Sequence, residues 1–467
     1  MDRILAESDL DAQFLAMSIQ HQRIDVATIS PKAAARFAQF TAVCLRSNIA
    51  RILLGLAHRP FVARLADSPL LQWFLQVGEV DEVNVFAKST SDRFERWVSA
   101  ENLRTLNAQL IALSMAPPTA EGLPAAFGME SPVVCDELFL DTTCVKTHIH
   151  FPVDWVLLRD AVRTLMKATI CVRRAGLKCR MPQSPEAFMR DMNKLCIAMS
   201  AQRRSKQAKR ERKRILRMMK TLTQRIARHA RTHRDVLEKE WPKTERSQSQ
   251  ARVIIKRIDQ VLEQLPAAIE QAHERIIGER QVANSEKILS IYDADIEVIV
   301  RGKAGAEVEF GNKFTLLENR QGLIIDYELH DANPGDSTLV KPSIERLPQA
   351  VQSVVKKLWA DRGMHSKKNV EYLEEKGIQS GLCPRDPQEL ADMMKEPGVK
   401  DGMKRRANTE ARIGVYKNVF LGNPSRGKSH GARKRATGWA VLTHNLWVLA
   451  RMPQARAQEE AQKAKAA

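Results

Sequence analysis

The chain has few cysteines and no long apolar run. Its seven cysteines include no Cys-x-x-Cys pair, which argues against a disulfide framework or a cysteine zinc site and favours a reducing compartment. No apolar run approaches the roughly 18 residues that span a bilayer, and the first residues lack the apolar segment of a secretory signal. We therefore expect a soluble, intracellular protein with no membrane partner.

The bulk composition is that of a globular protein with a polyanionic partner. With 467 residues, 44% of them hydrophobic and 28% charged, the chain is long enough for two or three domains with a real core. The formal net charge is +19 and the sequence pI is about 9.7. Such a balance favours nucleic acid before an acidic membrane.

The positive charge is concentrated in two stretches that contain few acids. Residues 203–234 carry 14 Lys/Arg and one acid, and residues 400–451 carry 12 Lys/Arg and two acids. Two basic surfaces indicate two places where a phosphate backbone is held. The alternative is a pair of solvated helix faces, which is how many charge runs are used.

The order of patterns predicts an α/β core that a helical hairpin insertion interrupts and that an all-α N-terminal domain precedes. The N-terminal domain would bind DNA ends or mediate dimerisation. The predicted segments are a helical domain (1–116), a proline-bearing linker (117–132), the first part of the core (133–151), a basic helical insertion (152–285), the second part of the core (286–453) and a flexible tail (454–467).

Within these segments we expect particular strands and helices. Two adjacent strands should meet near Asp141, and Pro266 should interrupt the second arm of the insertion's hairpin. Glycines, among them Gly311, should mark turns between the later strands. The further strand-like runs are 296–300, 307–310, 313–317, 322–329 and 377–383. The helical runs of the second core part are 340–358, 369–376, one from about 401, and 439–451.

Three acids have neighbours that suit phosphodiester chemistry. Asp141 and Asp361 each close an apolar strand-like run, and Glu410 lies inside a basic helical run. Carboxylates at the carboxyl ends of strands gather at one edge of a sheet. Such oxygen ligands suit a pair of Mg²⁺ ions, which can activate an attacking oxygen and stabilise a leaving one.

The helix around Glu410 places cations beside that acid. At 100° per residue, Arg406, Glu410 and Lys417 project within about 40° of one another. This spacing suits phosphate held around a scissile bond, although an ordinary surface ladder of charge has the same spacing.

Several motifs together resemble DDE transposases of bacterial insertion sequences, over roughly residues 130–450. The resemblance is closest to the ISNCY-like branch, whose RNase H-like core has a helical insertion. Met403 stands where many such enzymes have a tyrosine three positions before the arginine. The motifs are Leu138-Phe-Leu-Asp141-Thr-Thr, Phe151-Pro-Val-Asp-Trp, Phe310-Gly-Asn-Lys, Ala360-Asp361-Arg-Gly and the Glu410 helix.

The resemblance implies metal-dependent cleavage at transposon ends, followed by transfer of the 3′-hydroxyl strand into target DNA. Asp141, Asp361 and Glu410 would be the catalytic residues and would hold two Mg²⁺ (or Mn²⁺) ions. The partners would be double-stranded DNA, as terminal inverted repeats and target, and a second copy of the chain in a homodimer or larger assembly. The site of action would be the bacterial cytoplasm, at the nucleoid. The expected DNA-binding residues are Arg406, Lys417, Arg362, Arg210, Arg214 and Arg217.

Other interpretations remain open from the sequence. The basic stretches would also suit a non-catalytic, architectural DNA-binding protein. The segment Gly422–Ser429 has the spelling of a P-loop, which would indicate an ATPase if a buried strand preceded it. Asp336 is either a fourth acid of the site or a cap of the following helix.

Overall fold

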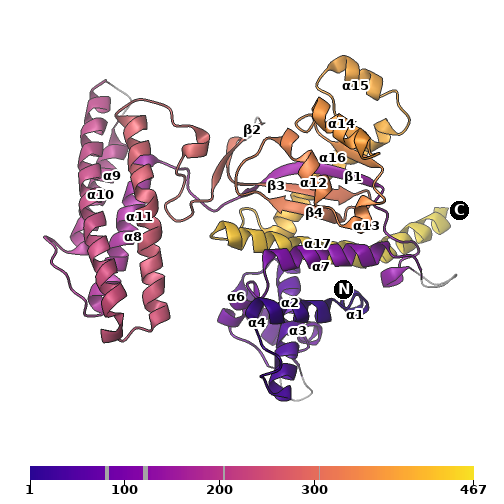
Figure 1. Cartoon of the computed structure of the whole chain (residues 1–467), viewed down its shortest axis with the longest axis horizontal. Coiled ribbons are helices and arrows are strands. Elements are labelled where there is room, and N and C mark those ends of the chain that lie inside the picture. Colours follow the sequence, from indigo (N-terminus) through magenta and orange to yellow (C-terminus); the bar gives the residue numbers. More distant parts are fainter. Residues whose placement is uncertain (79–83, 119–124, 203–205, 304–305, 467) are drawn as a thin grey trace. The chain divides into compact units, whose positions relative to one another are not determined.

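The computed structural model of the chain describes residues 1–78, 84–118, 125–202, 206–303 and 306–466. These residues form two compact units. The first consists of Met1–Thr147 together with Asn312–Ala467, and the second is His148–Gly311. The chain therefore leaves the first unit after one strand and returns to it in the middle of another (Figure 1).

The sheet is mixed and has the strand order β2-β3-β1-β5-β6, with β4 paired to the second half of β3. β1, β5 and β6 are parallel to one another, whereas β2 and β4 are antiparallel to β3. This mixed α/β arrangement is compatible with an RNase H-like core. The strands are β1 (Glu137–Lys146), β2 (Glu297–Lys303), β3 (Ala306–Asn319), β4 (Ile324–Leu329), β5 (Lys357–Ala360) and β6 (Gln379–Leu382).

The central strand β1 corrects the prediction of two strands that meet near Asp141. It is one continuous strand, and only Thr142 and Lys146 in it are more than marginally exposed. A strand covered on both faces shows no hydrophobic alternation, so its polar middle resembles a turn in the sequence. β3 is also continuous, and Gly311 lies inside it rather than at the predicted turn.

The N-terminal helices belong to the same compact unit as the sheet and share its hydrophobic core. Three of them start with a serine cap: Ser30 caps α3, Ser68 caps α5, and Ser99 forms a capping box with Asn102 at the start of α7. Whether residues 1–116 fold by themselves stays a prediction. The helices are α1 (Asp2–Glu7), α2 (Leu10–Gln22), α3 (Pro31–Leu53), α4 (His58–Asp67), α5 (Pro69–Leu75), α6 (Lys88–Phe94) and α7 (Ala100–Met115).

The C-terminal part of this unit places helices on both faces of the sheet. α7 and α17 lie side by side along one face, and α16 lies on the other (Figure 1). The helices are α12 (Val340–Glu345), α13 (Gln349–Gln352), α14 (Lys367–Glu375), α15 (Pro387–Met393), α16 (Val399–Val415), a π-helix (Tyr416–Leu421) and α17 (His430–Ala466).

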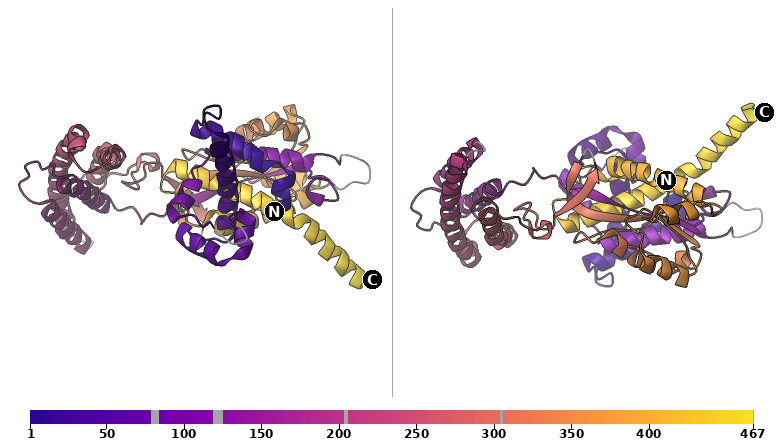
Figure 2. Two further views of the ribbon diagram at one scale, coloured as in Figure 1. Left: turned by 90° about the horizontal axis from the view of Figure 1, so that it is seen from below. Right: turned by 90° about the horizontal axis from the view of Figure 1, so that it is seen from above.

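Two helices predicted for this region have other bounds in the structure. The helix expected over 340–358 is two short helices, because Pro348 lies between them, and its last residues begin the strand β5. α17 starts at His430, well before the expected 439. It remains helical to Ala466, so it extends into the stretch where a flexible tail was predicted (Figure 2).

The second unit is a helical bundle with its own core. A hairpin was predicted, but α10 and α11 pack with two further helices in the described part of this unit. Pro266 lies inside α11 and does not end it, since the buried apolar seam of that helix continues on both sides. The helices are α8 (Asp154–Arg174), α9 (Pro185–Ala201), α10 (Lys206–Glu240) and α11 (Gln248–Ile276).

In the described ranges, no single helix has both the length and the hydropathy of a membrane span. α3 and α4 would reach those limits only as a pair, and they are bent by 104° where they join.

Candidate active site

The candidate active site lies on the face of the sheet that α16 covers. Side chains alternate between the two faces of a strand. Phe139 of β1 and Trp359 of β5 pack against Val399 of α16. Their neighbours Leu138 and Leu358 belong to the main core on the other face. Odd-numbered residues of both strands therefore point toward α16.

Asp141 and Asp361 follow this pattern and lie side by side. β1 and β5 are parallel, and their register pairs Leu140 with Ala360. Asp141 and Asp361 are the next residues on these neighbouring strands, whose backbones are about 4.8 Å apart. Both acids come two residues after the side chains that pack on α16. The sheet thus places them at the same height and on the same face.

Glu410 of α16 and Arg406, one turn earlier, complete this group. The pKa of Asp141 is raised to about 6, chiefly by burial and further by the negative charges of Asp361 and Glu410. A hydrogen bond from the Thr142 main-chain N–H and the positive charge of Arg406 act in the opposite direction. All three predicted acids and one predicted cation therefore act on one another through space.

Lys417 extends the basic edge of this group. It lies in the π-helix after α16, and its Nζ donates to Thr143 Oγ1 at 3.2 Å, two residues beyond Asp141 on β1. Lys417 is thus turned toward β1, whereas Arg406 is half-buried and Glu410 is exposed. Arg362 is exposed directly after Asp361.

A buried ion pair fixes α16 against the end of β3. Arg405 Nη1 lies 3.0 Å from Glu318 Oε1, and Thr409 donates to the same oxygen at 2.7 Å. The other guanidinium nitrogens donate to the main-chain carbonyls of Asn319 and Arg320 at 3.0 and 2.9 Å. Because both charged side chains are buried, the pair is saturated with hydrogen bonds, as a buried ion pair requires. The sequence showed Arg405 only as one of many cations.

Close packing of a glycine brings α16 onto the strands. A Cβ added to Gly402 would lie 2.1 Å from Cζ2 of Trp359, so only glycine allows this approach. The Trp359 Nε1–H donates to Glu137 Oε1 at 2.6 Å and holds the ring in place. Met403 is half-buried in the same small cluster.

Asp336 lies beside Asp361. Lys313 Nζ donates to Asp336 Oδ1 at 2.8 Å. A Cβ on Gly363 would lie 2.8 Å from Asp336 Oδ2 and 3.2 Å from Asp361 Oδ1, so both carboxylates face the same glycine. The short 3₁₀-helix that starts at Asp336 has no side-chain cap. Of the two interpretations left open by the sequence, the structure supports the one that places Asp336 at the site.

The acids suit a divalent cation by their chemistry, although no formed metal centre is seen. Among the described residues, no group of three or more Asp, Glu, His or Cys side chains has the spacing of a metal site. Asp141, Asp361 and Glu410 nevertheless supply the hard oxygen donors that Mg²⁺ prefers. The pKa of Asp141 is raised chiefly by burial and also by the charges of Asp361 and Glu410, and a cation nearby would favour the ionised form.

The predicted DNA-binding arginines of the insertion lie on α10. Arg210, Arg214 and Arg217 are exposed, and Arg214 makes an ion pair with Glu211 one turn away, with Nε 2.9 Å from Oε2. An exposed pair of this kind contributes little to stability, so its arginine can be shared with a phosphate.

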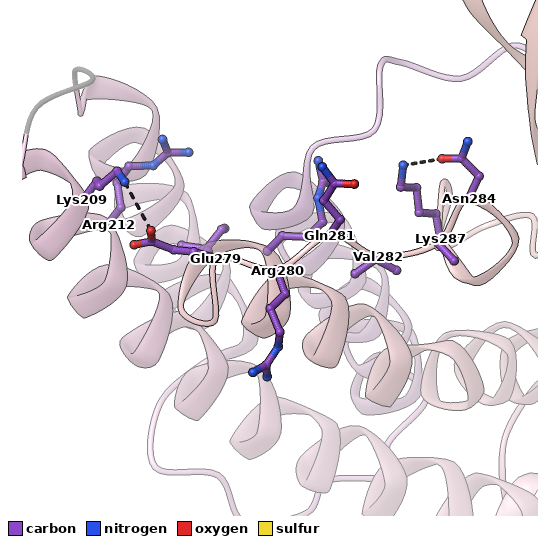
Figure 3. A pocket seen from close by; sticks show the side chains of 11 residues that line it. Lys209, Arg212, Glu279, Arg280, Gln281, Val282, Asn284 and Lys287 are labelled. Carbon is purple, nitrogen blue, oxygen red and sulfur yellow. Dashed lines mark hydrogen bonds and ion pairs between the residues drawn. The ribbon is translucent and has the colours of Figure 1, made fainter.

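A cavity of about 750 Å³ adjoins this stretch of α10, and the sequence did not reveal it. It is lined by Lys209 and Arg212 of α10 and by the segment 275–287 at and beyond the end of α11 (Figure 3). The Arg212 guanidinium lies over the Trp155 ring, 5.0 Å from its centroid, and Lys287 Nζ donates to Asn284. Within the described part of the chain, neither cation makes an ion pair. The sequence contains no sign of this basic site, because acids such as Glu279 lie among the cations of residues 275–287 and interrupt the run of positive charge.

Residues 301–446 match the family model of the transposase DDE domain. The matched stretch begins in β2, ends in α17 and contains Asp361 and Glu410, whereas Asp141 lies on the strand before the insertion. This stretch is similar to the transposase DDE domain, which supports the resemblance that the motifs indicated. The chain has no significant match among curated proteins or among solved structures.

Proposed function

We propose that this chain is the transposase of a bacterial insertion sequence, which cuts DNA at the ends of the element and joins the freed 3′-hydroxyl to target DNA. The observation that carries the proposal is the register of β1 and β5. It sets Asp141 beside Asp361 on the face covered by the helix of Glu410. The transposase DDE domain match supports the same assignment.

In this proposal Asp141, Asp361 and Glu410 hold two Mg²⁺ (or Mn²⁺) ions. Such ions, when bound, activate the attacking oxygen and stabilise the leaving oxygen of an in-line displacement. The chain's own cations do the positioning. Arg406 and Lys417 flank Glu410 along one helix face and would hold the phosphates on either side of the scissile bond.

Other residues support this arrangement. Lys313 donates to Asp336. This contact would hold the Asp336 carboxylate, with its negative charge, in a fixed position beside Asp361. Arg362, exposed after Asp361, would contact DNA next to the cut. Arg210, Arg214 and Arg217, with the cations of the adjoining cavity, would also bind the phosphate backbone of the duplex.

The insertion also supports the assignment to the ISNCY-like branch, because α8 to α11 lie between β1 and β2 of one sheet. We propose further that the chain acts as a homodimer or larger assembly on terminal inverted repeats and target DNA. Its site of action would be the bacterial cytoplasm, at the nucleoid.

The P-loop interpretation has less support. A P-loop follows a buried strand, whereas Gly422–Ser429 follows the π-helix Tyr416–Leu421. The first residue of the π-helix, Tyr416, packs its ring on Phe314 of the sheet, so this segment covers the sheet rather than extending it.

The test is cleavage of duplexes that contain the sequences flanking the coding region, with and without Mg²⁺. Asp361→Asn should reduce cleavage about a thousandfold or more, because a lost metal ligand removes about 4 kcal/mol of transition-state stabilisation. Binding to the same duplex should persist. Asp136→Asn is the matched control, since Asp136 is exposed just before β1, at the end of the strand opposite the acids.

Undiminished cleavage by Asp361→Asn would refute the assignment of the acids. DNA binding without metal-dependent cleavage by the wild type would favour the architectural alternative. ATP hydrolysis lost in Lys428→Ala would favour the ATPase.

A further inference from the structure

A second basic cavity lies in the first unit and involves a segment that the proposed chemistry leaves unused. Its volume is about 560 Å³. It is lined by residues near the end of α3, the start of α4 and the end of α6, together with the π-helix, the P-loop-like segment Gly422–Ser429 and the first turns of α17. We refer to it as the loop cavity. Its charged lining residues are Arg51, His58, Asp92, Glu95, Arg96, Arg426, Lys428 and Arg435.

The two acids of the loop cavity are already engaged. Glu95 pairs with Arg51, and Asp92 pairs with Arg96 at 2.8 Å. The other three cations, Arg426, Lys428 and Arg435, make no ion pair with any residue that the structure describes. A cavity with this surplus of positive charge is suited to an anion.

Burial and mutual repulsion reinforce this imbalance. The pKa of Arg435 is lowered by burial and by its neighbour Arg96. The pKa of Arg51 is likewise lowered by burial, and Arg426 adds to the effect. Arg51 is only 8% exposed, and its Nε is buried without a hydrogen-bond partner in the described residues. Burial is the main cause of both shifts, and the nearby Glu95 acts in the opposite direction on both pKa values.

The N-terminus of α17 opens into the same space. Ser429 caps the helix by accepting from the Ala432 main-chain N–H at 3.3 Å, and both residues line the loop cavity. The first main-chain N–H groups of a long helix carry partial positive charge and bind phosphate readily. They add to the side-chain cations.

The position of the cavity relative to the acids is fixed by β1. Ser425 N–H donates to the carbonyl of Lys146, the last residue of β1, at 2.8 Å. Lys146 is five residues beyond Asp141, about 17 Å along an extended strand. That length corresponds to about five nucleotides of one DNA strand. Lys417, bound to Thr143, lies between the two points.

We propose that the loop cavity binds backbone phosphates of the DNA strand about five nucleotides from the phosphodiester at the acids. This inference rests on the proposed function, because it takes the acids as the site of cleavage. The N-terminal part of this unit supplies Arg51 of α3 and Arg96 just after α6, so both parts of the unit would contact the same DNA strand. The source of the phosphate is DNA rather than a free nucleotide, since no strand leads into the P-loop-like segment.

The experiment compares the double variant Arg426→Gln/Lys428→Gln with wild type in binding to the end duplex between 50 and 200 mM salt. Both side chains are exposed, so the fold should survive, and an unchanged thermal midpoint checks this. Affinity should fall roughly tenfold at the lower salt, and the slope of log K against log salt should fall by about 1 to 2. Ethylation of phosphates about five nucleotides from the cut should block binding by wild type but not by the variant.

The matched control is Lys356→Gln/Lys376→Gln, which removes the same charge. These exposed lysines precede β5 and β6, at the sheet edge opposite the acids, and should leave the slope unchanged. A double variant that binds DNA with the wild-type slope would overturn the inference. So would ATP binding that is lost in Lys428→Gln while DNA binding is retained.

Failure of the proposed chemistry gives a different result. If wild type does not cleave in Mg²⁺, yet the double variant alone loses phosphate contacts at the predicted distance, the cavity is a DNA site and the assignment of the acids is wrong. If wild type cleaves and the double variant binds normally, the cavity assignment is wrong and the acids stand.

Discussion

Gly402 shows how the absence of one side chain determines the position of α16. Gly402→Ala should place a methyl group 2.1 Å from the Trp359 ring and force α16 outward. Overpacking of this kind costs about 1–3 kcal/mol. We therefore expect a lower thermal midpoint and a loss of cleavage larger than any loss of DNA binding, because Glu410 moves with the helix.

Gly414 on the same helix is the matched control. A Cβ there meets nothing within 4 Å, so Gly414→Ala should be neutral or stabilise the protein by up to about 1 kcal/mol. Equal midpoints for the two variants in a thermal melt would contradict the packing argument.

At the residue scale, the sequence predicted helical neighbours well and through-space neighbours poorly. The common face of Arg406, Glu410 and Lys417 follows from helical periodicity alone, and Lys417 does reach β1. The location of Asp336 could not be decided, because its partner Lys313 is 23 residues away. An aspartate that caps a helix and one that pairs with a distant lysine cannot be distinguished from the sequence alone.

Among the elements, α16 depends on one buried pair for its attachment to β3. Arg405→Met should leave Glu318, which is 1% exposed, without its main partner. Breaking such a pair destabilises a protein by about 3–5 kcal/mol. Chemical denaturation would measure the change in the free energy of unfolding.

The double variant Arg405→Met/Glu318→Met should cost less than the sum of the two single variants, since no buried charge then remains unpaired. Additive losses in this cycle would show that the pair does not attach the helix. The Arg405 guanidinium also lies 4.6 Å from the centroid of the Phe139 ring, so part of the single-variant loss will be packing.

At the element scale, the sequence predicted helices and strands correctly where the hydrophobic pattern is long. The prediction failed where burial on both faces of a strand removes the alternation of that pattern. The existence of α16, β4 and β6 follows from periodicity and turn residues, with ends within about three residues. β1 was divided wrongly because Asp141-Thr-Thr interrupts an apolar run inside a strand that is covered on both faces. The π-helix after α16 has no sequence signal of its own.

For the whole molecule, we expect the free energy of unfolding to depend on divalent cations, because three acids lie together at the candidate site. If Asp141, Asp361 and Glu410 hold Mg²⁺ or Mn²⁺, the folded state should gain about 1.4 kcal/mol per bound ion at a free metal concentration ten times Kd. Thermal melts should therefore shift upward on adding metal and return on adding a chelator, without any DNA present.

Asp361→Asn should lose most of this shift, whereas Asp136→Asn should keep it. A shift of the same size in both variants would mean that the metal binds elsewhere. The measurement needs no knowledge of the DNA ends, so it tests the acids independently of cleavage.

The division of the chain at Thr147 and Asn312 has a consequence for biosynthesis. β1 leaves the ribosome long before its sheet neighbours, because the whole insertion is translated between β1 and β3. At about 5–20 residues per second, roughly ten to thirty seconds pass before β3 emerges. The insertion has its own core and can fold during that interval. During that interval β1, the apolar strand that carries Asp141, has no neighbouring strand to pair with. A chaperone that binds nascent β1 should therefore raise the yield of active protein.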